Sequence, residues 1–133
     1  MVYTTDVRGV TAADLEGFFS DWPVPPTPDQ HLEVLRGSDH VVLARDVEGG
    51  RIVGFVTAIS DGVLSAFIPL LEVLPEHRGS GIGSELVRRM LAELESFAMV
   101  DLVCDPELVP FYRRFELMLL SGMSQRRPHL LSS

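Results

Sequence analysis

Three glycines at alternate positions, Gly79, Gly81 and Gly83, lie where an apolar segment gives way to a long amphipathic one. Glycine lets the backbone approach an anion closely and adopt positive φ angles. The amphipathic segment is patterned as a helix, and the first turn of a helix has unpaired amides and a partial positive charge. Arg78 adds a fixed charge directly before the glycines. These residues predict an anion site that suits a phosphorylated cofactor.

The spacing of the glycines excludes the two best known phosphate-binding motifs. The Rossmann motif has two residues between its second and third glycines, whereas this sequence has one between Gly81 and Gly83. The P-loop has a lysine followed by serine or threonine after its last glycine, whereas Ser84-Glu85 follows here. On spacing alone, a strand-to-helix turn without any ligand remains the alternative.

Other residues with chemical potential lie close to the glycines in sequence. Glu72 is a carboxylate within the apolar run from Val63 to Leu74, where a charge is costly unless it has a partner or a task. We take Glu72 as the candidate general base; exposure to solvent or pairing with an arginine is the alternative. His77 is interpreted as a loop histidine and Cys104 as a core residue. With one cysteine in the chain, we predict no zinc cluster and no metal site.

The elements that position these residues follow from the hydrophobic pattern. We expect a short helix opening at Thr11, a proline-rich loop over 22–28 that covers the acceptor side of a cleft, and a second helix from Thr27 or Pro28 to Gly37. Three strands are then predicted over 40–47, 51–59 and 63–74, the last with a bulge at Pro69. They are followed by a helix from the glycines to Phe97 and a strand over 100–104. A helix over 107–115 and a strand over 117–123 complete the pattern.

Length and charge limit the possible functions. The chain has 133 residues, which suits one domain over 1–133, and its formal net charge of −8 argues against binding nucleic acid or an anionic membrane surface. The same charge favours a cationic partner. No signal peptide and no apolar run of membrane-spanning length is seen, so we expect a cytoplasmic protein.

Two motifs in register resemble those of one family. The stretch from Val73 to Leu86 is similar to the acetyl-CoA loop of the GNAT superfamily of N-acetyltransferases, whose Arg/Gln-x-x-Gly-x-Gly/Ala pattern is matched by Arg78, Gly81 and Gly83. The family's last helix commonly reads Asn-x-x-Ala-x-x-x-Tyr, and the same frame here runs from Asp105 to Tyr112. Asp105 and Leu108 replace the usual Asn and small residue, and Glu116-Leu117 replaces a usual Gly-Phe. The resemblance covers about residues 3–123.

The resemblance implies a fold and a set of ligand contacts. The fold would be the α/β (α+β) GNAT fold, with a central mixed, mostly antiparallel sheet splayed between its fourth and fifth strands and flanked by helices. Leu71, Glu72 and Val73 would offer backbone groups to the pantetheine arm of acetyl-CoA. The pyrophosphate would be bound beside Arg78 by the main-chain amides of Gly79, Ser80, Gly81, Ile82, Gly83 and Ser84. Tyr112 would lie near the sulfur of CoA and protonate the departing thiolate.

We therefore expect an acetyl-CoA-dependent N-acetyltransferase that acts by direct attack of a primary amine. The acceptor would be a small-molecule amine, such as a polyamine or an amino sugar, or a protein or peptide amine. A non-catalytic module that binds or senses acyl-CoA is the alternative, and a binder of phosphate-sugars or nucleotides is a third possibility. Few residues follow Met123, so the family's last strand would be absent or supplied by a partner subunit, which favours a homodimer.

Overall fold

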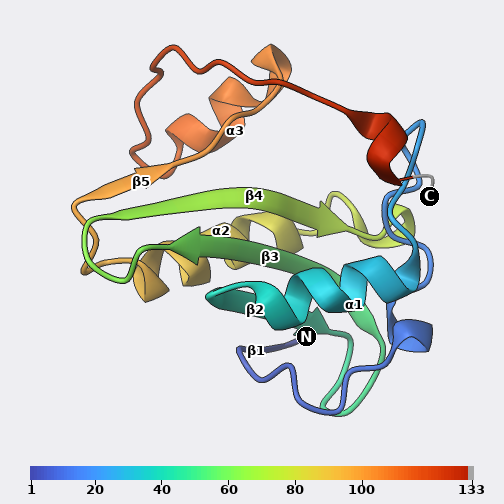
Figure 1. The fold of residues 1–133 in the computed structure, drawn as a ribbon. Coiled ribbons are helices and arrows are strands. Elements are labelled where there is room, and N and C mark those ends of the chain that lie inside the picture. The colour runs from blue at the N-terminus through green and yellow to red at the C-terminus, as the bar shows by residue number, and fades with distance from the viewer. Residues whose placement is uncertain (132–133) are drawn as a thin grey trace.

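A five-stranded sheet forms the centre of the computed structural model, which describes residues 1–131. The strands lie in the sheet in their order along the chain. The first four are antiparallel to their neighbours, and the fourth and fifth are parallel. The strands are β1 (Val2–Thr4), β2 (His40–Arg45), β3 (Ile52–Ser60), β4 (Ser65–Val73) and β5 (Met99–Asp101) (Figure 1). This arrangement confirms the predicted mixed, mostly antiparallel sheet.

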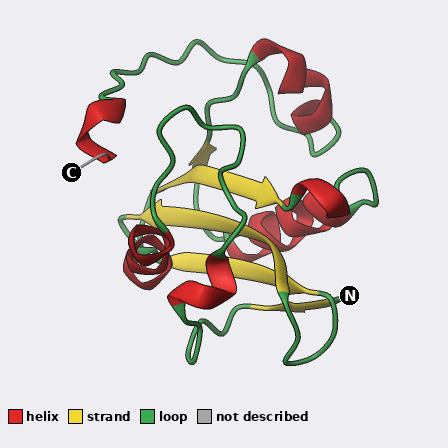
Figure 2. Ribbon diagram, turned by 90° about the vertical axis from the view of Figure 1, so that its right-hand side faces the viewer, coloured by secondary structure: helices red, strands yellow, loops and turns green. Residues whose placement is uncertain are grey.

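Helices flank the sheet on both faces. The helix α1 (Pro28–Gly37) lies on one face and α2 (Ile82–Glu93) on the other, while the short α3 (Val109–Arg113) lies beyond β5 (Figure 1). Short turns of 3-10 helix accompany these elements: η1 (Ala12–Leu15), η2 (Pro75–His77), η3 (Pro106–Leu108) and, as the last element described, η4 (Pro128–Leu131). Figure 2 shows that long loops join many of the helices and strands.

The start of α1 is set by local hydrogen bonds that its sequence predicts. The Thr27 hydroxyl accepts a hydrogen bond from the Gln30 amide at 3.1 Å, and the Gln30 side chain accepts one from the Thr27 amide at 2.8 Å. Pro28 occupies the first turn, where its missing N–H costs nothing. His31 and Leu35 are the buried residues of α1, and the His31 ring packs on Phe55 of β3. The predicted helix from Thr27 or Pro28 to Gly37 is confirmed.

The opposite face of β3 lies close against α2. A Cβ atom on Gly54 would lie 3.1 Å from Leu86 Cδ1 and 3.2 Å from the Glu72 carbonyl oxygen. Leu86, Val87 and Met90 of α2 are buried in this contact layer. Glycine at position 54 therefore lets α2 pack closely on the sheet.

The sheet opens between β4 and β5. Their parallel pairing runs from Ser65 opposite Met99 only as far as Phe67 opposite Asp101. Directly after that point the register between β3 and β4 shifts, at Ile68 and Pro69, which confirms the predicted bulge. The last residues of β4, up to Val73, therefore have no partner on the β5 side. This is the predicted splay.

Several predicted elements differ in extent or kind. The helix predicted to reach Phe97 ends at Glu93, the strand predicted over 100–104 is Met99–Asp101, and the helix predicted over 107–115 is η3 followed by α3. The helix expected at Thr11 is only the single turn η1, because Gly17 and Phe19 adopt positive φ angles of 92° and 62° and end the helical path. The strand expected over 117–123 is absent among the described residues, and that segment is irregular. Glu116 has a φ of 65°, which lies outside the extended region that strand residues adopt, and the segment after it forms no pairing with β5.

Replacing Glu116 by glycine is expected to stabilise the protein. A non-glycine residue in the left-handed region costs about 1–2 kcal/mol, of which the greater unfolded-state freedom of glycine cancels part. We expect Glu116→Gly to raise the free energy of unfolding by about 0.5–1 kcal/mol, measured by urea denaturation. A lower midpoint than that of the unmodified protein would contradict the prediction.

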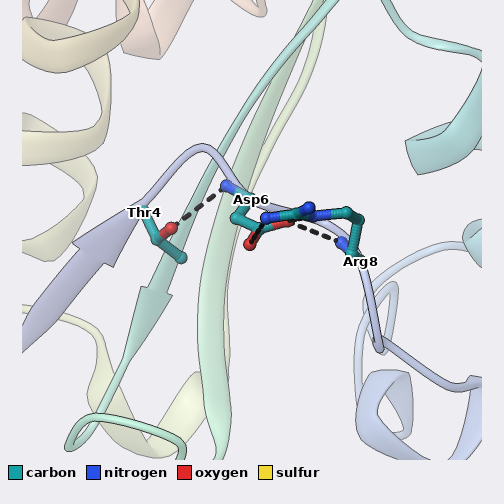
Figure 3. A network of polar contacts seen from close by, with 3 residues as sticks. All are labelled: Thr4, Asp6 and Arg8. Carbon is teal, nitrogen blue, oxygen red and sulfur yellow. Dashed lines mark hydrogen bonds and ion pairs between the residues drawn. The ribbon is translucent and has the colours of Figure 1, made fainter.

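The turn after β1 is fixed by contacts among neighbouring residues. The Asp6 amide donates to the Thr4 hydroxyl at 3.0 Å, and the Arg8 guanidinium donates to the Asp6 carboxylate at 2.9 and 3.0 Å (Figure 3). The hydrogen bonds from Arg8 lower the pKa of Asp6 to about 2. Asp6 therefore carries its charge throughout the physiological range and holds the turn.

Candidate active site

The glycine loop forms an uncapped start to α2. Gly79 and Gly81 have φ angles of 83° and 88°, and Gly81 is the N-cap residue of α2 without a side chain to cap it. The Ser80 hydroxyl donates to the His77 carbonyl at 2.8 Å and so is turned back into the loop. Amides of the first turn, from Ile82 onward, therefore lack a side-chain cap and can receive an anion.

Arg78 lies between this loop and a distant segment. Its Nε donates to the Val73 carbonyl oxygen at 3.0 Å, and its guanidinium forms an ion pair with Asp21 at 2.9 Å. Asp21 belongs to the segment directly before the proline-rich loop. Arg78 thus joins the end of β4 to that segment, and its expected role at a phosphate stays a prediction.

The end of β4 presents alternate side chains to the two faces of the sheet. Val73 lies toward α2, since a Cβ on Gly83 would be 3.8 Å from its Cγ2 atom. Leu71 has the same parity and Glu72 the opposite one. Glu72 pairs in the sheet with Phe55, the residue that packs on α1. Glu72 therefore points to the α1 face, while Leu71 and Val73 lie toward the glycine loop.

Glu72 is half-buried and held by a residue far away in sequence. Its Oε1 accepts a hydrogen bond from the Phe19 amide at 3.0 Å. Burial raises the pKa of Glu72; the hydrogen bond from Phe19 and the charge of Arg78 oppose this rise. Glu72 is thus only partly exposed and, among residues 1–131, forms no ion pair with an arginine; its role as general base stays a prediction.

The helix α3 packs against the start of α2. A Cβ on Gly83 would lie 4.0 Å from Cζ of Phe111, and the Arg114 guanidinium donates to the Ser84 hydroxyl. Arg114 also lies over the rings of Phe111 and Phe115, at 5.2 and 5.4 Å from their centroids. Arg114 therefore adds a cation beside the uncapped turn. Sequence analysis missed this residue, because nothing local connects it to a serine 30 positions earlier.

Tyr112 lies on α3 with its side chain half-buried. Burial raises its pKa to about 12, and the neighbouring Cys104 thiol contributes in the same direction. Cys104 is itself only partly buried, beyond the end of β5, so its prediction as a core residue is wrong. Among residues 1–131, no hydrogen bond joins Tyr112 to Glu72. The Tyr112 ring packs on Phe111, the residue that lies near Gly83, and its role beside the sulfur of CoA stays a prediction.

A pocket of about 420 Å³ lies beside Glu72 on the α1 face. Phe19, whose amide is bonded to Glu72, lines it together with Trp22, and so does Leu70, two residues before Glu72 on the same face of β4. Pro26 adds a wall from the proline-rich loop, which agrees with the expected cover of a cleft. A larger recess of about 1000 Å³ lies at the β1 edge, lined by other residues, and shares none with the glycine loop.

His31 is buried behind this pocket without a hydrogen-bond partner. It is 1% exposed, and neither ring nitrogen has a partner. Its ring lies 4.9 Å from Phe19, 5.4 Å from Phe18 and 4.3 Å from Phe55, measured between centroids. Burial lowers the pKa of His31 to about 4. The imidazole is therefore neutral at neutral pH.

The buried His31 is expected to make the protein sensitive to acid. Between pH 6.5 and 4 the unfolded chain binds a proton that the folded chain excludes, so stability falls as the pH falls. The loss attributed to this group is about 3 kcal/mol over that interval. Urea denaturation at several pH values would measure it. His31→Phe should flatten the dependence by that amount, and an unchanged slope in the variant would contradict the assignment.

No helix within residues 1–131 is long and apolar enough to cross a membrane. In the same residues, no group of three or more histidine, cysteine, aspartate and glutamate side chains is placed to hold a metal ion.

The sequence and the fold are similar to those of known acetyltransferases. Residues 8–116 match the model of the acetyltransferase (GNAT) family. A crystal structure from Deinococcus radiodurans R1, assigned as an acetyltransferase, is 48% identical and covers 96% of this chain and 89% of its own, with a TM-score of 0.91. Serotonin N-acetyltransferase 2 from Oryza sativa subsp. japonica is 28% identical over 79% of this chain. This chain spans only 55% of that relative's length.

A third similarity concerns the fold alone. An aminoglycoside 6′-N-acetyltransferase, solved as a complex with coenzyme A, is 22% identical, with a TM-score of 0.63. The match covers 77% of this chain and 61% of that one.

Proposed function

Because this chain belongs to the GNAT acetyltransferase family, we propose that it transfers an acetyl group from acetyl-CoA to a primary amine. One observation carries the proposal: the uncapped N-terminus of α2 lies against the open end of β4, and Glu72 lies on the other side of that strand. An anionic, extended cosubstrate and an amine can thus approach from opposite faces.

The residues present fit acetyl-CoA. Its pyrophosphate would be held by main-chain amides of the loop from Gly79 to Ser84, where no side-chain cap competes. Arg114 and Arg78 would add positive charge at that end. Backbone groups of Leu71 and Val73, on the unpaired edge of β4, would bond to the pantetheine arm. The similar enzyme solved with coenzyme A supports this placement at the level of the fold.

Two side chains would handle the protons. A primary amine is mostly protonated near pH 7, and Glu72, with its raised pKa, is suited to accept that proton before attack. Tyr112, whose pKa of about 12 keeps it protonated, would give its proton to the thiolate that leaves. The nitrogen–carbonyl bond forms as the carbon–sulfur bond breaks, and the protein takes no acyl group itself.

The test is a calorimetric titration with acetyl-CoA, CoA and ATP in parallel, followed by a thiol-release assay over pooled amines. We expect micromolar binding of both CoA species, no binding of ATP, and amine-dependent release of thiol. Binding without release from any amine would favour the non-catalytic acyl-CoA module. Binding of ATP as tight as that of CoA would favour the nucleotide-binding alternative.

We propose further that the protein acts in the cytoplasm as a homodimer. The outer edge of β5 is unpaired in the sheet, and the irregular segment after α3 exposes Met118, Leu119, Leu120 and Met123. Burial of these side chains against a second copy would remove apolar surface from water. Light scattering after gel filtration should give a mass of two chains, and Leu119→Asp with Leu120→Asp should give one. A monomer at high micromolar concentration would contradict the proposal.

A further inference from the structure

We propose that the pocket beside Glu72 binds the carbon skeleton of the acceptor, so that the acceptor is a primary amine on a compact apolar, preferably aromatic, body. This inference rests on the proposed function, and it narrows the acceptor from amines in general to amphiphilic ones. Two independent features carry it: the lining of the pocket, and the unpartnered polar atoms buried behind it.

Six of the nine residues that line the pocket are apolar, and Gln30, His31 and Glu33 complete the wall. They come from three parts of the chain: the loop before α1, the helix α1 with β4, and the single turn η4. Its apolar lining residues are Phe19, Trp22, Pro26, Val34, Leu70 and Leu131. A volume of about 420 Å³ is in the range of small-molecule sites and holds a single ring with a short chain.

Glu72 supplies a negative charge next to the pocket, although it is not one of the lining residues. Phe19 lines the wall and its amide donates a hydrogen bond to the Glu72 carboxylate, so this part of the wall and the carboxylate are held together. An ammonium placed at Glu72 would direct its carbon chain along Leu70 and the ring of Trp22. This distribution, with one charge at one end and an apolar surface beyond it, matches an amine with a single apolar substituent.

The buried polar atoms behind the pocket are a second observation. In the described part of the chain, three buried side-chain atoms lack a hydrogen-bond partner: both ring nitrogens of His31 and the hydroxyl of Thr57. His31 lines the pocket, and Thr57 pairs in the sheet with Leu70, which also lines it. Unpaired buried polar groups are rare in folded proteins, and they gather here at one place. A neutral imidazole also adds a ring surface that does not repel an ammonium.

The lining disfavours the other amines considered above. No lysine or arginine is among the lining residues, so the phosphate of an amino sugar phosphate would have no counter-charge. The second ammonium of a polyamine would enter a mostly apolar space whose only lining carboxylate is Glu33, on α1.

Trp22 gives a direct test, because it is the only tryptophan of the chain and it lines the pocket. Its fluorescence would be titrated with 2-phenylethylamine, putrescine and glucosamine 6-phosphate, with and without saturating CoA. We expect a saturable change with 2-phenylethylamine at a Kd at least tenfold below those of the other two. Val34→Arg places a cation in the pocket wall on a residue that is 38% exposed, and should raise that Kd at least tenfold.

The matched control is Val63→Arg in the β3–β4 turn, where the valine is 82% exposed and far from the pocket in the sheet. This variant should bind 2-phenylethylamine as the unmodified protein does. Equal or tighter binding of putrescine or glucosamine 6-phosphate overturns the inference, and so does an unchanged Kd in Val34→Arg. Thiol release separates the two proposals: turnover of polyamines without binding of 2-phenylethylamine leaves the acetyltransferase and removes this inference. Selective binding of 2-phenylethylamine without any turnover keeps the apolar amine as the ligand of the pocket and removes the acetyltransferase.

Discussion

Glu72→Gln is expected to lower kcat with a primary amine by about 100-fold or more at pH 7 and to leave the affinity for acetyl-CoA unchanged. Glutamine keeps the shape of the side chain, and its oxygen can still accept the hydrogen bond from the Phe19 amide. The variant therefore removes the proton acceptor without removing the contact that holds the loop. Steady-state thiol release and calorimetry would measure the two effects separately.

The pH profile distinguishes a general base from a merely structural carboxylate. The unmodified enzyme should lose activity as the pH falls through the raised pKa of Glu72. The rate of Glu72→Gln should approach that of the unmodified enzyme at high pH, because the amine is then already unprotonated and needs no general base. Glu93→Gln, at an exposed position near the other end of α2, is the matched control and should behave as the unmodified protein. A rate deficit that stays constant at all pH values would contradict the role.

Tyr112→Phe is expected to reduce kcat about ten- to a thousand-fold with little effect on the binding of CoA. Among residues 1–131 no hydrogen bond is made by this hydroxyl, so its removal should cost the fold little. A loss of turnover with unchanged stability would thus report a lost proton donor. Single-turnover measurements with bound acetyl-CoA would follow the chemical step directly.

The second tyrosine of the chain provides the control for this experiment. Tyr3 lies on β1, at the far edge of the sheet from α3, and burial raises its pKa as well. Tyr3→Phe should leave kcat unchanged. If Tyr112→Phe keeps full activity, the thiolate leaves unprotonated or takes its proton from water, and Tyr112 has only a packing role.

Much of the fold could be predicted because its signals are local. Thr27 and Gln30 start α1 within four residues of each other, and Gly37 is its last residue. The glycines at 79 and 81, which adopt positive φ angles, predict the loop before α2, and Pro69 predicts the bulge in β4. In each case the residue that decides the geometry lies inside the element it affects. The family resemblance then supplied the order of the strands.

Other features depend on contacts between distant residues and could not be predicted. The hydrogen bond from Phe19 to Glu72 joins positions 53 apart, and it requires a positive φ at a phenylalanine. The ion pair of Arg78 with Asp21 and the bond from Arg114 to Ser84 are of the same kind. The strand predicted over 117–123 failed for a related reason. Its apolar run fits a strand, but a strand also needs a neighbour with which to pair, and none of the described strands pairs with this segment.

The bulge at Pro69 has a consequence for the energetics of binding. Proline has no amide hydrogen to donate to a neighbouring strand, and the pairing of β4 with β5 stops two residues earlier. The splay between β4 and β5 is thus determined by the sequence itself, and no ligand has to open it. An entering molecule gains hydrogen bonds to the free edge of β4 without first breaking any between strands. Such preorganisation leaves more of the intrinsic contact energy to appear as affinity.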